Sequence, residues 1–230
     1  MNLLELENIL SNNVNINTEV NRQMVLENLD NSSIVNILKN ILDDEFQLLN
    51  ISKRSYRHSN GFDKILLIDK RPYYALRLHI WNPINSCDGH IHNHEWDLSG
   101  VVLFGSYRWE LYEYENSENI DGLYYYECKY NKNYSQHLLT NEKKVLTKKI
   151  FDVTMAEKSF YNLKSSICHK ITMSNEYCAS LMLHGNSLNQ KIVVISNNKL
   201  INNLNELYIY YSVQELAELL KNVIIKMERK

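Results

Sequence analysis

The chain has 230 residues, of which 44% are hydrophobic and 23% are charged, and its formal net charge at pH 7 is −2. These values are typical of a soluble globular protein, and the small net charge gives no electrostatic reason to bind nucleic acid or an anionic membrane. No apolar stretch approaches the roughly 20 residues that a helix needs to cross a bilayer. The first residues lack the basic flank and apolar core of a secretory signal, so we expect a cytoplasmic protein.

The cysteines show neither the C-x-x-C spacing of a metal site nor the density of a disulfide framework. They are Cys87, Cys128, Cys168 and Cys178. Reduced thiols in a cytoplasm are the simplest interpretation of this pattern.

The first part of the chain, residues 3–49, has a helical pattern. Apolar residues recur there at spacings of three and four, as expected for one face of a helix: Ile34, Ile37, Leu38, Ile41 and Leu42. Ser32 or Ser33 is the predicted N-cap of this helix. A second helix is predicted over residues 19–29.

From residue 63 onward the pattern changes to short runs rich in β-forming residues, separated by turn residues such as Asn60-Gly61 and Asp121-Gly122. The predicted strands are residues 64–68, 74–81, 90–94, 98–104, 107–114, 123–130, 144–153, 159–163, 169–173, 179–184 and 191–195. About ten short strands without intervening helices predict a sandwich or a barrel.

The C-terminal residues return to a helical pattern. Ser212 and Glu215 have the spacing of a capping box, and one apolar stripe follows, made of Val213, Leu216, Leu219, Leu220, Val223, Ile224 and Met227. We therefore predict a helical extension over residues 1–54, a barrel over 55–200 and a closing helix over 201–230. The terminal helices are expected to cover the open ends of the barrel. As an alternative, their apolar stripes form a homodimer interface.

Three histidines alternate in the segment His90-Ile91-His92-Asn93-His94, and a fourth histidine, His169, lies much later in a similar apolar setting. In a β-strand, residues two apart point to the same face. Imidazole is the commonest protein ligand for transition metals. In the mouth of a small barrel, His92, His94 and His169 would form a site with open coordination positions. The alternative is a set of polar residues on an exposed strand face.

With these residues in view, the sequence resembles the cupin superfamily. The first cupin motif has the pattern H-x-H, an acidic residue a few positions later and a glycine further on. His92-Asn93-His94 and Gly105 match this motif, with Leu98 at the acidic position, and His169 matches the histidine of the second motif. Loss of the acidic ligand resembles thiol dioxygenases similar to cysteine dioxygenase, which bind ferrous iron with three histidines. The resemblance implies a mainly β, cupin-type double-stranded β-helix (a jelly-roll barrel) with an Fe(II) site.

The resemblance covers residues 63–184. Residues 63–69 resemble the strand with the family's carboxylate-binding arginine, which falls here on Lys64. Residues 179–184 resemble the strand of a Ser-His-Tyr relay, of which Ser180 keeps the serine, while Met182 replaces the histidine and His184 the tyrosine. Lysine neutralises a carboxylate but does not form the bidentate fork of arginine. These departures from the family pattern argue against cysteine itself as the substrate.

Several further residues are candidates for the site. Arg77 and His79 alternate with apolar residues, so they lie either on a solvated outer face or on a cavity wall as substrate contacts. His90 is expected at the rim as a substrate contact, because a fourth ligand would close the site. His184 is either a hydrogen-bonded core histidine or a general acid or base, since the charge of imidazole changes near physiological pH.

The first functional hypothesis is a mononuclear non-haem iron oxygenase acting with dioxygen on a small polar substrate, which the resemblance suggests is a thiol or amino-acid-like molecule. Lys64 and Arg77 would steer an anionic group of that substrate. The second hypothesis is a metal-dependent isomerase or lyase of cupin fold, with zinc, nickel or manganese; copper is a further candidate ion. The third is a cupin that binds a small molecule without catalysis.

Overall fold

The computed structural model describes residues 1–12, 15–85, 89–117, 121–131, 136–173, 176–188, 191–200 and 209–229. Cys87 and the beginning of the predicted closing segment, residues 201–208, lie outside this set. Among the described residues, no helix is long and apolar enough to cross a membrane.

The helices occupy both ends of the chain, as predicted: α1 (Leu3–Asn12), α2 (Glu19–Glu27), α3 (Asn31–Asp43), α4 (Glu45–Ser52) and α5 (Val213–Glu228). The predicted cap of α3 at Ser32 or Ser33 is wrong. Asp30 caps this helix, because its carboxylate accepts the backbone N–H of Ser33 at 2.7 Å. The capping box of Ser212 and Glu215 at the start of α5 is confirmed.

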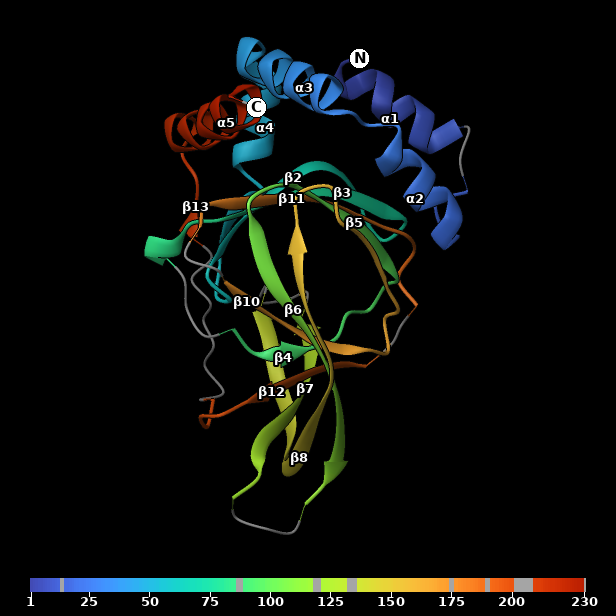
Figure 1. The fold of residues 1–230 in the computed structure, drawn as a ribbon, viewed down its shortest axis with the longest axis vertical. Coiled ribbons are helices and arrows are strands. Elements are labelled where there is room, and N and C mark those ends of the chain that lie inside the picture. Colours follow the sequence, from blue (N-terminus) through green and yellow to red (C-terminus); the bar gives the residue numbers. More distant parts are fainter. Residues whose placement is uncertain are drawn as a thin grey trace.

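The strands are β1 (Tyr56–His58), β2 (Phe62–Lys70), β3 (Tyr74–Trp81), β4 (Ile91–His92), β5 (Leu98–Phe104), β6 (Ser106–Asn116), β7 (Leu123–Asn131), β8 (Gln136–Ala156), β9 (Phe160–Leu163), β10 (Cys168–Met173), β11 (Cys178–His184), β12 (Ile192–Ser196) and β13 (Ile209–Tyr210). They form two antiparallel sheets. The upper sheet in Figure 1 has the order β13-β1-β2-β3-β11-β5-β9, and the lower one closes as β10-β4-β12-β7-β8-β6.

The two sheets face one another across a shared core. That core joins Trp81 of β3 and Val102 of β5 to Tyr107 and Trp109 of β6. Two antiparallel sheets packed in this way, with helices before and after them in the chain, confirm the mainly β, double-stranded β-helix class predicted from the sequence.

The helices lie against the outer face of the upper sheet, not at an open end of the barrel as expected (Figure 1). The reason is that β3 is buried on both faces. Leu76, Leu78 and Ile80 pack against the helices, and Arg77 and His79 alternate with them on the inner face.

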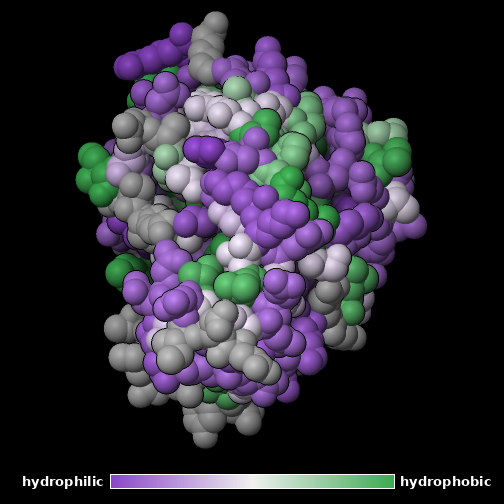
Figure 2. Space-filling model, turned by 60° about the horizontal axis from the view of Figure 1, so that its bottom comes forward, coloured by the Kyte–Doolittle hydropathy of each residue, from purple (hydrophilic) through white to green (hydrophobic). Residues whose placement is uncertain are grey.

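The face of the molecule seen in Figure 2 is mainly hydrophilic, with hydrophobic side chains in small separate groups.

Candidate metal centre

Three histidines from two paired strands and a loop meet inside the lower sheet. His92 at the end of β4 is the direct cross-strand partner of His169 in β10. The ring centroids of these two histidines are 4.5 Å apart, and His94 lies 5.0 Å from each of them. One potential ligand atom from each imidazole lies within 4.8 Å of the other two. The three histidines singled out in the sequence are therefore brought together by the fold.

The predicted strand over residues 90–94 is shorter than expected, because β4 contains only Ile91 and His92. Asn93 ends it: its side chain accepts the backbone N–H of Val193 at 2.6 Å and donates to the carbonyl of Lys191 at 3.0 Å. These side-chain bonds add to the backbone bond from the N–H of Asn93 to the carbonyl of Val193 at 3.3 Å. His94 therefore reaches the site from a loop, where its backbone N–H donates to the carbonyl of Ser165 at 3.4 Å.

The three imidazoles are held in the neutral form that a metal ion requires. Burial lowers the pKa of all three, and the pKa of His94 and of His169 falls well below the usual value. His92 Nδ1 donates to the carbonyl of His90 at 2.9 Å, which leaves its other nitrogen as the one with the free lone pair. Nδ1 of His169 is buried without a hydrogen-bond partner. A divalent cation fits this donor set.

A cavity of about 50 Å³ opens beside the three histidines. Most of its wall is aromatic or aliphatic: Phe62, Trp81, Leu98, Tyr107, Trp109, Tyr161, Leu163, Ile171 and Met182. The polar part of the wall comes from Asn60, His79 and His90, in addition to the three histidines of the candidate site. His79 is buried, with Nε2 lacking a hydrogen-bond partner. Of the two interpretations of the polar face of β3, the structure supports the cavity wall for His79.

Arg77 and His184 lie together and outside the lining of this cavity. The guanidinium Nη2 of Arg77 is 3.1 Å from Nε2 of His184, whose Nδ1 is 2.8 Å from the carbonyl of Gly185. A carbonyl only accepts, so Nδ1 carries the proton and Nε2 accepts from the arginine. Burial, followed by the charge of Arg77, lowers the pKa of His184 well below its usual value. His184 is therefore a neutral acceptor that orients Arg77.

Trp96, which was not a candidate on sequence grounds, lies between this pair and the candidate metal site. Its ring stacks on His184 at 4.3 Å and on His94 at 5.9 Å, and the guanidinium carbon of Arg77 lies 4.6 Å from its centre. The guanidinium is buried, and burial lowers the pKa of Arg77 to about 10. The indole face offers this cation a partner in place of a carboxylate.

The remaining predicted residues occupy separate places. Lys64, half-buried on β2, has its ammonium 5.3 Å from the centre of the Tyr56 ring and does not belong to the cavity lining. Ser180 is fully buried on β11, close to the hydroxyls of Tyr107 and Tyr161, without a well-aligned hydrogen bond from its Oγ. Burial raises the pKa of both tyrosines.

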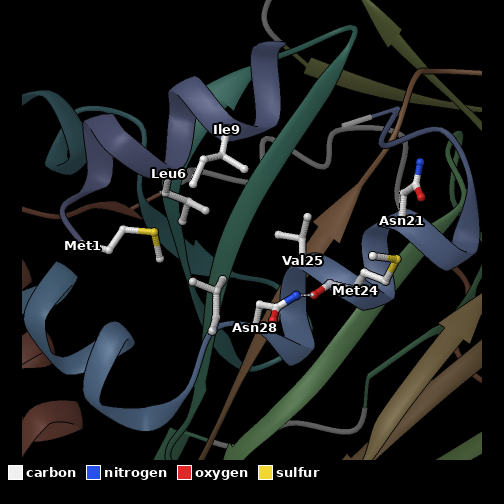
Figure 3. A pocket seen from close by; sticks show the side chains of 8 residues that line it. Met1, Leu6, Ile9, Asn21, Met24, Val25 and Asn28 are labelled. Atoms are coloured by element: carbon white, nitrogen blue, oxygen red, sulfur yellow. Dashed lines mark hydrogen bonds between the residues drawn. The ribbon is translucent and has the colours of Figure 1, made fainter. Parts of the chain in front are cut away.

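A second cavity, of about 290 Å³, lies between α1 and α2 (Figure 3). These helices pack on the face of the upper sheet that points away from the lower sheet (Figure 1). Leu6 and Ile9 from α1 line it together with Met24 and Val25 from α2. Its polar groups are asparagine amides, and that of Asn28 donates to the carbonyl of Met24 at 2.8 Å. Because its described lining has no histidine, cysteine or carboxylate, we place the candidate site at the three histidines.

No protein-family model matches the chain, and no curated protein matches it. Solved structures with a similar fold include hydroxypropylphosphonic acid epoxidase from S. wedmorenis, which is 11% identical with a TM-score of 0.33. That match covers 57% of this chain and 53% of the epoxidase chain. Hydroquinone 1,2-dioxygenase PnpCD is 12% identical with a TM-score of 0.36, covering 60% of this chain and 71% of that chain. An uncharacterized protein with a double-stranded β-helix domain from Klebsiella pneumoniae is 10% identical with a TM-score of 0.35, and the match covers 63% of this chain and 94% of that chain.

The match thus spans about half the length of the epoxidase. At identities and TM-scores this low, the likenesses carry no argument about chemistry. We therefore interpret the site from its own residues.

Proposed function

We propose that this protein is a mononuclear, non-haem metal enzyme of the oxygenase class, in which His92, His94 and His169 hold Fe(II). The observation that supports this most strongly is the convergence of three neutral imidazoles, with ligand atoms within 4.8 Å of one another, beside a mainly apolar cavity. Three protein ligands leave coordination positions open on the cavity side. When bound there, Fe(II) would supply electrons for dioxygen chemistry and a template that brings two reactants together.

The cavity wall suits this chemistry. Dioxygen is small and apolar, so an apolar wall favours its entry and disfavours water. The described lining contains no carboxylate and no lysine, and its side chains able to transfer protons, beside the three candidate ligands, are His79, His90, Tyr107 and Tyr161. The mainly apolar wall is the feature that favours an oxygenase over an isomerase or lyase.

The chain's other candidate residues have positioning roles in this proposal. His79 and His90 lie on the wall and contact the substrate. His184 holds Arg77 in place through Nε2 and does not transfer protons with the substrate, because it lies outside the cavity lining. Ser180, buried beside Tyr107 and Tyr161, supports the tyrosine side of the wall.

Elemental analysis of protein purified without chelator, combined with oxygen uptake over a panel of small thiols and hydroxyl compounds, tests this function. About one iron per chain and substrate-dependent oxygen uptake are expected. Zinc, nickel, manganese or copper without oxygen uptake would instead support a non-oxidative lyase or isomerase, and a folded metal-free protein would support a binding protein.

A pair of variants tests the ligand assignment separately from the reaction. His94→Ala is expected to lose the metal, because two imidazoles remain. His90→Gln is expected to retain it, because His90 lines the cavity without belonging to the set of three. Unchanged metal content in His94→Ala would refute the assignment.

A further inference from the structure

The described residues that line the cavity beside the three histidines are all formally uncharged. Among the described lining residues there is no lysine, arginine, aspartate or glutamate. An amino acid or another zwitterion carries two opposite charges, and each must be hydrated or paired when it leaves water. This wall offers no ion-pairing partner to either of them.

The two cations expected to bind an anionic substrate lie beside the cavity, in contact with other groups. Arg77 donates to His184 and lies over the ring of Trp96. Lys64 is the cross-strand partner of His79, and its ammonium lies near the ring of Tyr56. Neither side chain belongs to the described lining, so neither is positioned for a direct ion pair with a ligand held there, although their charges act on it from beside the wall.

A metal ion at the three histidines would bring its own positive charge, which must be included in the electrostatics of the site. The ion would act on the substrate atom nearest to it and would coordinate one anionic group, such as a thiolate or an alkoxide. It does not help a second charged group further along the molecule, where Phe62, Trp81 and Trp109 form the wall.

The wall offers several neutral hydrogen-bonding groups. Asn60, His90 and Tyr107 lie on it, together with the buried and unpartnered Nε2 of His79, whose ring lies 4.6 Å from that of Phe62. With a volume of about 50 Å³, the cavity takes up the head of a small ligand and the atoms next to it.

We propose, building on the metal-dependent function above, that the substrate is a small molecule with one polar head at the histidines and an uncharged, mainly apolar remainder. The remainder lies against the aromatic wall, where a neutral hydrogen-bonding group on it meets His79. Amino-acid-like substrates are disfavoured, because their second and third charged groups would have no partner in the wall.

Three thiols of similar size test this inference, because they share the head and differ only in the charge of the remainder. They are 2-methylpropane-1-thiol (uncharged), mercaptoacetate (anionic) and 2-aminoethanethiol (cationic). All three tryptophans of the chain report on the cavity, since Trp81 and Trp109 line it and Trp96 stacks with His94. Tryptophan fluorescence therefore follows binding in metal-free protein and in Co(II)-loaded protein alike.

The uncharged thiol is expected to bind with a Kd at least about tenfold lower than either charged thiol in the metal-free protein. Equal or tighter binding of a charged thiol there, or no binding of the uncharged thiol, would overturn the inference. Co(II) loading is expected to strengthen binding of the thiol head in all three. A chain that binds no metal yet keeps the preference would refute the proposed enzyme and leave the ligand class standing.

Two neighbouring positions on β10 provide a matched pair of variants. Ile171 lines the cavity, whereas Thr172 is exposed. Ile171→Lys is expected to shift the preference toward mercaptoacetate by about tenfold or more, because it places a cation in the wall. Thr172→Lys adds the same charge on the other face and is expected to leave the order unchanged. Equal effects of the two variants would show that the thiols bind outside the cavity. If Ile171→Lys does not fold, the comparison of the three thiols in the unmodified protein still tests the inference.

Discussion

His92 and His169 are direct cross-strand partners in the β4–β10 pair, and their ring centroids are 4.5 Å apart. Opposed residues of an antiparallel pair project to the same face of the sheet. The backbone pairing alone therefore places two imidazoles from distant parts of the chain side by side. Only His94, held in the loop after Asn93, depends on side-chain hydrogen bonds for its position.

Replacing His169 with leucine is expected to abolish metal binding without destabilising the metal-free protein. His169 Nδ1 is buried without a well-aligned hydrogen bond, the backbone of His92 being its nearest partner, and a buried group left in this state costs about 1–3 kcal/mol of folding free energy. The metal-free His169→Leu variant should therefore melt at the same temperature as the parent or higher, as measured by calorimetry in the presence of chelator. A clear loss of stability would indicate that the imidazole is a structural core residue.

Trp96→Leu is expected to lower the free energy of unfolding by about 2 kcal/mol, because the buried Arg77 guanidinium loses the indole face on which it lies. Chemical denaturation measures this effect. The loss should be smaller in an Arg77→Met background, where no buried cation remains. Additive effects of the two substitutions would show that the residues are not coupled.

Gly105 is required by the backbone. Its φ is +72°, and a Cβ there would lie 2.5 Å from the carbonyl oxygen of Tyr177. Gly105→Ala is expected to cost about 2 kcal/mol or more in a denaturation experiment. Gly89→Ala serves as the control, since the nearest atom to a Cβ there is 3.6 Å away. Similar effects of both substitutions would contradict this steric explanation.

Asp152 is expected to stabilise the protein in a pH-dependent way. Hydrogen bonds from Arg108 and Lys149 lower its pKa from 3.8 to about 2. Because the folded-state pKa is the lower one, the stabilisation is complete above pH 3.8 and is lost as the pH falls to about 2. Asp152→Asn should therefore lower the melting temperature at neutral pH and have a diminishing effect below pH 3.8. A pH-independent difference between variant and parent would refute this origin.

The sequence was sufficient for features that depend on local periodicity. Alternation of apolar residues predicted most strands, and the apolar stripe after Ser212 predicted α5 and its buried side. The H-x-H pattern with a distant histidine predicted the set His92, His94 and His169 that the fold brings together. Each of these signals lies within a few residues, or in residue types that have few roles other than metal binding.

The sequence was less informative about side chains whose role depends on partners far away in the chain. Nothing in the pattern of residues 90–94 indicates that Asn93 ends β4 by bonding to Val193 and Lys191. Trp96 was equally hidden, because its role depends on Arg77 and His184 from two other strands. In the sequence alone, a large aromatic residue two positions after a candidate ligand histidine is indistinguishable from a residue that only packs in the core.

The sequence by itself therefore determined the β-fold, the terminal helices and three histidines with the chemistry of metal ligands. The tertiary structure alone decided that Arg77 and His184 lie outside the cavity and that the described residues of its wall are uncharged. The physical reason is that strand periodicity fixes which face a residue occupies. Only the packing of the two sheets fixes which side chains on that face share a cavity and which are covered by a neighbour such as Trp96.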